Sequence, residues 1–240
     1  MGSTTNEVEV CNLALTEINQ RLITSLDSEP DDSPQQTYCK LVYPTARKSL
    51  LEAYDWSFAL TRIKLDPVKI YTTNSELLVD ENGFDSDLYT DEYFGWNSCF
   101  QIPADCLKIS GIYDGNWHRQ INVNGITMPW VRQGNYIYSQ ESYSGKTGDD
   151  GSFEVILPVL NLQYVQDIED VNMFSPSFIE ALALSIAKKL TKQFNNSTAF
   201  LQFLDMKFDN ALREAKIRDF RQTNTDGIIS FPILDESMRF

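Results

Sequence analysis

Residues that could perform catalysis are sparse in this sequence. Its single histidine, His118, stands between Trp117 and Arg119, with no obvious serine or cysteine nucleophile beside it. A histidine without such a partner gives little support for acid–base or nucleophilic catalysis. We therefore interpret His118 as a structural residue and expect no catalytic residue in this chain.

Metal-binding and nucleotide-binding patterns are also incomplete. The acidic stretch 80–87 begins D-E-N-G, whereas a calcium-binding EF-hand loop begins D-x-D-x-D-G. The Gly-Lys-Thr triplet lacks the upstream glycine and the strand-to-helix setting of a phosphate-binding loop, so we expect 144–152 to form a hairpin tip. The cysteines lack C-x-x-C spacing and are expected to be reduced and mostly buried. They are Cys11, Cys39, Cys99 and Cys106. We expect neither a metal nor a cofactor.

The composition excludes several classes of partner. The 240 residues include 20 Lys+Arg and 34 Asp+Glu, which gives a formal net charge of −14. Such a chain cannot present the long basic surface that tight binding to nucleic acid or an anionic membrane requires. No apolar run approaches the roughly 18–20 residues of a membrane helix, and the N-terminus has no signal-peptide pattern. We expect a soluble protein that is not secreted.

Helices are predicted at both ends of the chain. Apolar residues recur every three or four positions over 6–20. Ser33-Pro34 supplies an N-cap and a first-turn proline for a second helix, and Ser175-Pro176 repeats this signal. A last helix is predicted over 198–219. Its expected buried face consists of Leu201, Leu204, Phe208, Ala211 and Ala215.

The region between these helices is typical of β-structure over 99–176. Its aromatic and β-branched runs are short, and turn-forming pairs such as Asn124-Gly125 and Gly134-Asn135 separate them. We predict a small antiparallel sheet or barrel.

Charge is distributed unevenly along the chain. Segment 66–98 carries eight acidic residues and one basic residue, and we interpret it as an inserted loop or small subdomain. Segment 177–221 carries eight basic and five acidic residues. Opposite charges on one molecule favour a head-to-tail contact between copies, so a self-assembling structural protein is favoured over an enzyme. The expected parts are 1–65, 66–98, 99–176, 177–221 and a tail, 222–240.

The order of short motifs resembles a known family, the head-to-tail adaptor proteins of tailed bacteriophages of the tail tubular protein A type. The resemblance extends over about residues 6 to 219. One departure is that Asn19-Gln20-Arg21 stands where a glycine-containing turn is usual. The insertion 66–98 is also longer than the family pattern. The motifs are Asn12–Leu15, Ile23–Asp27, Cys39–Leu51, Trp56–Ala59, Phe100–Leu107 and Phe178–Ala183.

The resemblance implies an α+β fold. The N- and C-terminal helices would form a bundle, with an antiparallel β-domain inserted between them and an extended C-terminal tail. The protein would form a dodecameric ring with itself beneath the portal protein, at the head–tail junction of a virion assembled in the bacterial cytoplasm. DNA would pass through without specific binding, no membrane would be involved, and a downstream tail or nozzle protein would attach below.

Two sets of residues are expected to make these contacts. A short apolar tail gains burial only on another surface, so we expect it to dock on the portal, although it could instead pack on its own helices. Charged residues are expected between subunits. The tail set is Ile228, Ile229, Phe231, Pro232, Ile233 and Leu234. The inter-subunit set is Asp85, Asp87, Asp91, Glu92, Lys188, Lys189, Lys192 and Arg213.

Two alternatives remain open at this point. A carbohydrate-binding or catalytic tail component would line a sugar groove with aromatic side chains. A cytosolic regulator would form a stable small oligomer without affinity for a portal. The aromatic residues of the first alternative are Trp117, Trp130, Tyr136 and Tyr138.

Overall fold

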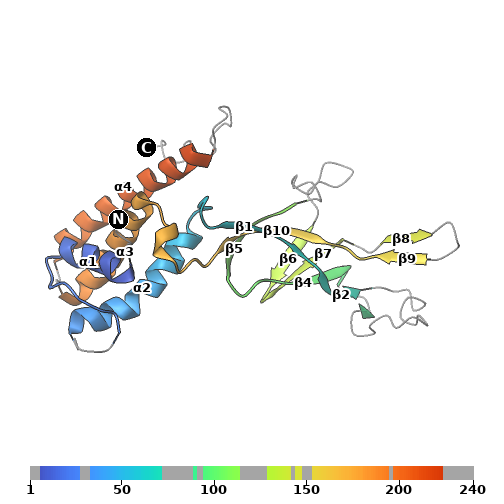
Figure 1. Cartoon of the computed structure of the whole chain (residues 1–240), viewed down its shortest axis with the longest axis horizontal. Helices are drawn as coiled ribbons and strands as arrows, with labels where there is room; N and C mark the ends of the chain where they lie inside the picture. Colours follow the sequence, from blue (N-terminus) through green and yellow to red (C-terminus); the bar gives the residue numbers. More distant parts are fainter. Residues whose placement is uncertain are drawn as a thin grey trace. The chain divides into compact units, whose positions relative to one another are not determined.

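The computed structural model shows a mixed α and β protein whose chain divides into two compact units (Figure 1). The helical unit comprises Met1–Phe58 and Ile168–Phe240, and the β unit comprises Ala59–Asp167. The β unit is therefore inserted, in sequence, between two parts of the helical unit. The structure describes residues 6–27, 33–71, 89–90, 94–113, 129–141, 144–147, 153–194 and 197–223.

Four α-helices lie in the described part of the helical unit, and α3 is in contact with all the others. The predicted capping signals are confirmed, because Ser33 Oγ accepts the backbone N–H of Gln36 at 3.3 Å and Ser175 Oγ accepts that of Phe178 at 3.3 Å. The last helix continues one turn beyond the predicted residue 219. The helices are α1 (Glu7–Glu17), α2 (Pro34–Glu52), α3 (Pro176–Phe194) and α4 (Thr198–Thr223), and a 3-10 turn, η2 (Val171–Met173), precedes α3.

Asn19 performs the role of the missing glycine at the end of α1. Its φ of 54° lies in the left-handed region, which asparagine tolerates better than most residues do. The N–H of Asn19 donates to Thr16 O at 3.1 Å, and the N–H of Gln20 donates to Leu15 O at 2.9 Å. These two bonds form a Schellman motif, so α1 ends without glycine.

An aromatic cluster fills the core of the helical unit where the chain leaves it. Trp56 and Phe178 are fully buried, with ring centroids 5.0 Å apart in an edge-to-face arrangement. Phe58 and Phe174 pack on Phe178 at 5.1 and 4.8 Å. The indole N–H of Trp56 donates to Leu50 O at 2.9 Å, so this large side chain is buried with its polar atom satisfied.

A buried carboxylate on α4 holds the same junction. Asp219 is only 4% exposed, and its carboxylate accepts the Ser57 backbone N–H at 3.0 Å and the Ser57 hydroxyl at 2.6 Å. Hydrogen bonds to a charged acceptor are stronger than those between neutral groups. Asp219 therefore ties the C-terminal half of α4 to the last residues before the β unit.

The β unit contains three sheets. The first has the order β1-β10-β5, and the second has the order β3-β2-β4-β7-β6, in which only β2 and β3 are parallel. Phe100, Ile137 and Leu162 are fully buried in its core. The strands are β1 (Leu60–Leu65), β2 (Pro67–Tyr71), β3 (Tyr89–Thr90), β4 (Ser98–Gln101), β5 (Cys106–Tyr113), β6 (Trp130–Gln133), β7 (Tyr136–Ser139) and β10 (Leu160–Gln166), and the third sheet is the hairpin of β8 (Ser144–Thr147) with β9 (Phe153–Ile156).

The units divide the chain elsewhere than the sequence patterns predict. Residues 60–65, expected at the end of the helical part, form β1 and pair along their whole length with β10. The expected β-domain limit at 176 also shifts, because the β unit ends at Asp167. The described residues of the acidic insertion 66–98 include β2 and β3, which are strands of the second sheet rather than a separate loop. The remainder of that insertion lies outside the described residues.

Asp219 provides a direct test of the junction. Replacing Asp219 by alanine removes the acceptor of the Ser57 hydrogen bonds and should lower the free energy of unfolding by about 2 kcal/mol. Asp209, exposed on the same helix, provides the matched control, and Asp209→Ala should change it by less than about 0.5 kcal/mol. Urea unfolding followed by circular dichroism compares the two. Equal midpoints for both variants would contradict the anchoring role.

Candidate interaction surface

The structure treats the predicted basic inter-subunit residues differently from one another. Lys188 on α3 forms an ion pair with Asp205 on α4 at 2.7 Å, and its Nζ lies 4.3 Å from the centroid of the Phe208 ring. Lys188 is therefore engaged within its own chain. Lys189 and Lys192 are exposed on α3, and Arg213 is exposed on α4, where it donates to Asn210 Oδ1 at 3.2 Å.

Several other predicted residues lie outside the part of the chain that the structure describes. They are the acidic candidates Asp85, Asp87, Asp91 and Glu92, the tail residues Ile228, Ile229, Phe231, Pro232, Ile233 and Leu234, His118, Trp117 and the stretch 80–87.

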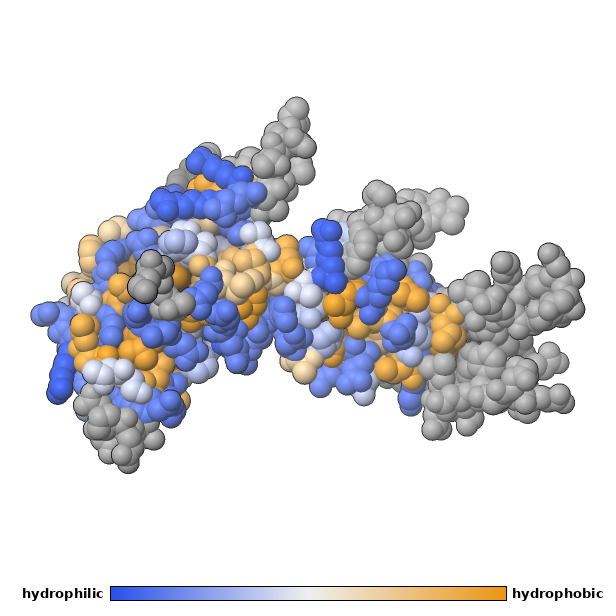
Figure 2. All heavy atoms as spheres, in the orientation of Figure 1, coloured by the Kyte–Doolittle hydropathy of each residue, from blue (hydrophilic) through white to orange (hydrophobic). Residues whose placement is uncertain are grey.

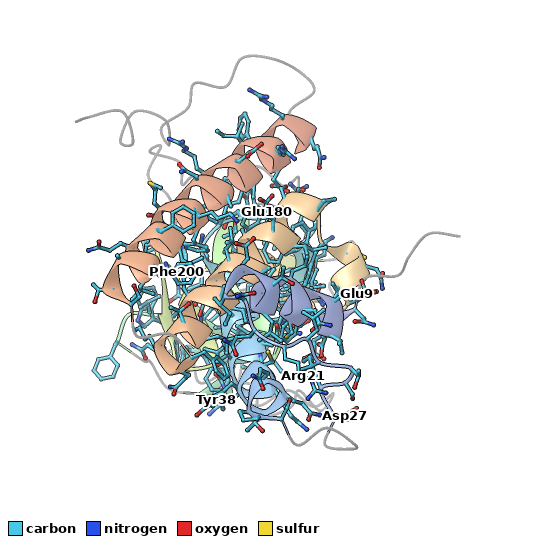
Figure 3. The ribbon with its side chains drawn as sticks, turned by 90° about the vertical axis from the view of Figure 1, so that its left-hand side faces the viewer. Glu9, Arg21, Asp27, Tyr38, Glu180 and Phe200 are labelled. Atoms are coloured by element: carbon cyan, nitrogen blue, oxygen red, sulfur yellow. The ribbon has the colours of Figure 1, made fainter. Side chains whose placement is uncertain are left out.

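An apolar stripe on the solvent side of α4 is the feature that the sequence patterns did not single out. Phe203 and Met206, one turn apart, are 51% and 58% exposed. The ring of Phe200, labelled near the start of α4 in Figure 3, stacks on that of Phe203 with centroids 6.4 Å apart. We call Phe200, Phe203 and Met206 the α4 crest. Leu204 and Ala215, from the predicted buried face, are fully buried, so the crest and the core occupy different sides of one helix.

Ion pairs border the α4 crest on both sides. Asp205 pairs with Lys188 of α3, and Lys207 pairs with Glu17 of α1, with Nζ to Oε2 at 2.6 Å. Asp205 and Lys207 are the two sequence neighbours of Met206. Leu13, one turn before Glu17 on α1, is 49% exposed and adds apolar surface beyond that pair. An apolar centre with a polar rim is the usual composition of a protein–protein interface.

The surface view agrees with this arrangement. Figure 2 shows apolar residues reaching the surface between hydrophilic ones on the helical unit. Large apolar side chains exposed together mark interaction sites more often than isolated ones do. The signal available in the sequence was the presence of Phe200, Phe203 and Met206 outside the stripe that the helical period assigns to the core.

The described residues offer little for metal or membrane chemistry. No group of three or more His, Cys, Asp or Glu side chains within the described ranges is placed to hold a metal ion. None of the helices in the part of the chain seen in the structure is long and apolar enough to span a bilayer. The Gly-Lys-Thr triplet lies in β8, which pairs with β9, so residues 144–147 form a strand and not the expected hairpin tip.

The aromatic residues of the sugar-groove alternative do not share one face. In the antiparallel pair of β6 and β7, Trp130 is opposite Ser139, and Tyr138 is opposite Val131. Because side chains alternate along a strand, Trp130 lies on the face of the buried Ile137, whereas Tyr136 and Tyr138 lie on the other face. Trp130 packs against the core of the β unit. This separation removes the groove that the alternative requires from the described residues.

Comparison with known proteins adds no relative. The sequence matches no protein-family model and no curated protein.

Adjacent residues of α4 test the assignment of crest and core. Leu204→Ala should lower the free energy of unfolding by about 2–5 kcal/mol, because it leaves a cavity in the core. Phe203→Ala should cost less than about 1 kcal/mol, because that side chain is half exposed in the free chain. Thermal and urea unfolding measure both. A larger loss for Phe203→Ala than for Leu204→Ala would show that Phe203 belongs to the core.

Proposed function

We propose that this protein is a structural virion component, a head-to-tail adaptor that joins the portal to the tail of a bacteriophage. The observation that carries the proposal is the α4 crest, an apolar surface between two ion pairs in the helical unit. It lies within the part of the chain, residues 6 to 219, whose motifs resemble the adaptor family. A surface of this kind suits a protein that associates with copies of itself.

In this proposal the helices form a bundle that builds the wall of a dodecameric ring. The α4 crest packs on the neighbouring subunit, and Lys189, Lys192 and Arg213 face acidic residues of that neighbour, including Asp85, Asp87, Asp91 and Glu92. Opposite charges select the head-to-tail orientation, and the apolar crest supplies the burial. Lys188 contributes to the rim through its pair with Asp205 rather than across the interface.

The net charge of −14 supports a channel that DNA traverses without binding. Acidic walls repel phosphates, so a channel with such walls does not retain the passing duplex. The apolar tail residues from Ile228 to Leu234 dock on the portal, and the opposite end of the ring receives a downstream tail or nozzle protein.

Electron microscopy of the protein mixed with the portal protein encoded near it tests the proposal. The full chain should form a twelve-fold ring stacked on the portal. A chain that ends at Thr223, the last residue of α4, should keep its circular dichroism spectrum and lose portal binding. Undiminished binding by the shortened chain would refute tail docking.

A charge placed on the α4 crest separates ring closure from portal binding. Phe203→Glu should bind the portal through its tail but fail to close a ring, because the glutamate would have to be buried in the subunit contact. Gln202→Glu is the matched control, since Gln202 is exposed one position earlier and the added charge is the same. Mass photometry counts the subunits bound per portal. Closed rings formed by Phe203→Glu would remove the crest from the interface.

A further inference from the structure

Two cysteines from different helices meet in the core of the helical unit. Cys11 on α1 and Cys39 on α2 are both fully buried, and their thiols are hydrogen-bonded to each other. Along the chain they are separated by the end of α1 and the loop that follows it. The pair therefore provides a sulfur-to-sulfur contact between helices that lie apart in the sequence.

The hydrogen bond makes the two sulfurs chemically unequal. Donation from the Cys11 thiol lowers the pKa of Cys39, against the opposing effect of burial. The same bond, together with burial, raises the pKa of Cys11. A thiolate stabilised by a neighbouring thiol is the arrangement found in redox-active dithiols.

We propose that Cys11 and Cys39 form a redox-active dithiol, which a peroxide converts into an intramolecular disulfide between α1 and α2. The Cys39 thiolate attacks one oxygen of hydrogen peroxide, the O–O bond breaks, and the departing hydroxide takes a proton to become water. The resulting Cys39 sulfenic acid is attacked by the Cys11 sulfur, which loses its proton. The S–S bond forms, the S–O bond breaks and a second water leaves. Two thiols are oxidised and one peroxide is reduced.

The other two cysteines provide internal controls. Cys99 in β4 is buried, and its thiol interacts with the hydroxyls of Tyr138 and Tyr71 rather than with a second thiol. Cys106 in β5 is partly exposed. Both lie in the β unit, whereas Cys11 and Cys39 lie in the helical unit. Peroxide reaches the buried pair through local opening of the helices, so the reaction reports on that opening.

The biological consequence of this chemistry rests on the proposed function, although the chemistry itself does not. Thiols stay reduced in a bacterial cytoplasm and are oxidised outside the cell. A virion protein passes from the first setting to the second when the host lyses. The disulfide would then form after assembly and hold α1 to α2 in the released particle, because closing a loop restricts the unfolded chain.

Peptide mapping of the full chain tests the proposal without any variant. The reduced protein is treated with hydrogen peroxide, its remaining thiols are blocked in denaturant, and it is digested with trypsin. Cleavage after Arg21 and Lys40 places the two cysteines in adjacent peptides, 1–21 and 22–40. The expected product is these two peptides linked, two hydrogens lighter than their sum and separated again by dithiothreitol. Separate peptides that carry sulfinic acids would overturn the proposal.

Two variants and a stability measurement extend this test. Cys11→Ser should leave Cys39 to oxidise without forming a link, whereas Cys99→Ser should leave the link unchanged. The oxidised chain should melt about 5 °C or more above the reduced chain. An unchanged melting temperature in the linked protein would show that the bond does not restrain the helices. A chain that forms the disulfide but does not bind the portal would remove only the biological consequence.

Discussion

The contact between Asp219 and Ser57 is the constraint on which the helical unit depends, because it fixes the point where the chain departs for the β unit. Trp56 and Phe58, on either side of Ser57, lie against Phe178 in the aromatic cluster. The carboxylate comes from the C-terminal half of α4, so the first and last parts of the chain must both be in place before this junction is complete. Such long-range closure makes the helical unit dependent on residues far apart in the sequence.

The helix that supplies this anchor also presents the interaction surface. The inner side of α4 buries Leu204 and Ala215, while its outer side exposes Phe203 and Met206. The two ion pairs on the flanks, to Glu17 and to Lys188, hold α4 in a fixed rotation about its axis, and the crest is therefore presented in one orientation. An interface built on a rigid helix loses little conformational entropy on association.

Local signals in the sequence were sufficient to predict the helices, whereas pairing between distant residues was not predictable. Ser33 and Ser175 act within three residues of their partners, so their capping roles are visible in a short window. The assignment of residues 60–65 depends on β10, about a hundred residues later, and no local pattern encodes that partner. Asp219 looks like any exposed helix charge in the sequence, and its burial follows only from packing. The α4 crest was hidden because apolar residues on a helix are first attributed to its core.

The pairing of β1 with β10 has a consequence for how such a chain could be altered. These are the first and last strands of the β unit, and Gln166 N–H also donates to Ala59 O at 2.9 Å, so the two points where the chain enters and leaves are adjacent. A module whose ends meet can be removed, enlarged or exchanged without changing the separation of the residues that it connects. The helical unit thus accepts the β unit as a plug-in, and the two can diverge at independent rates.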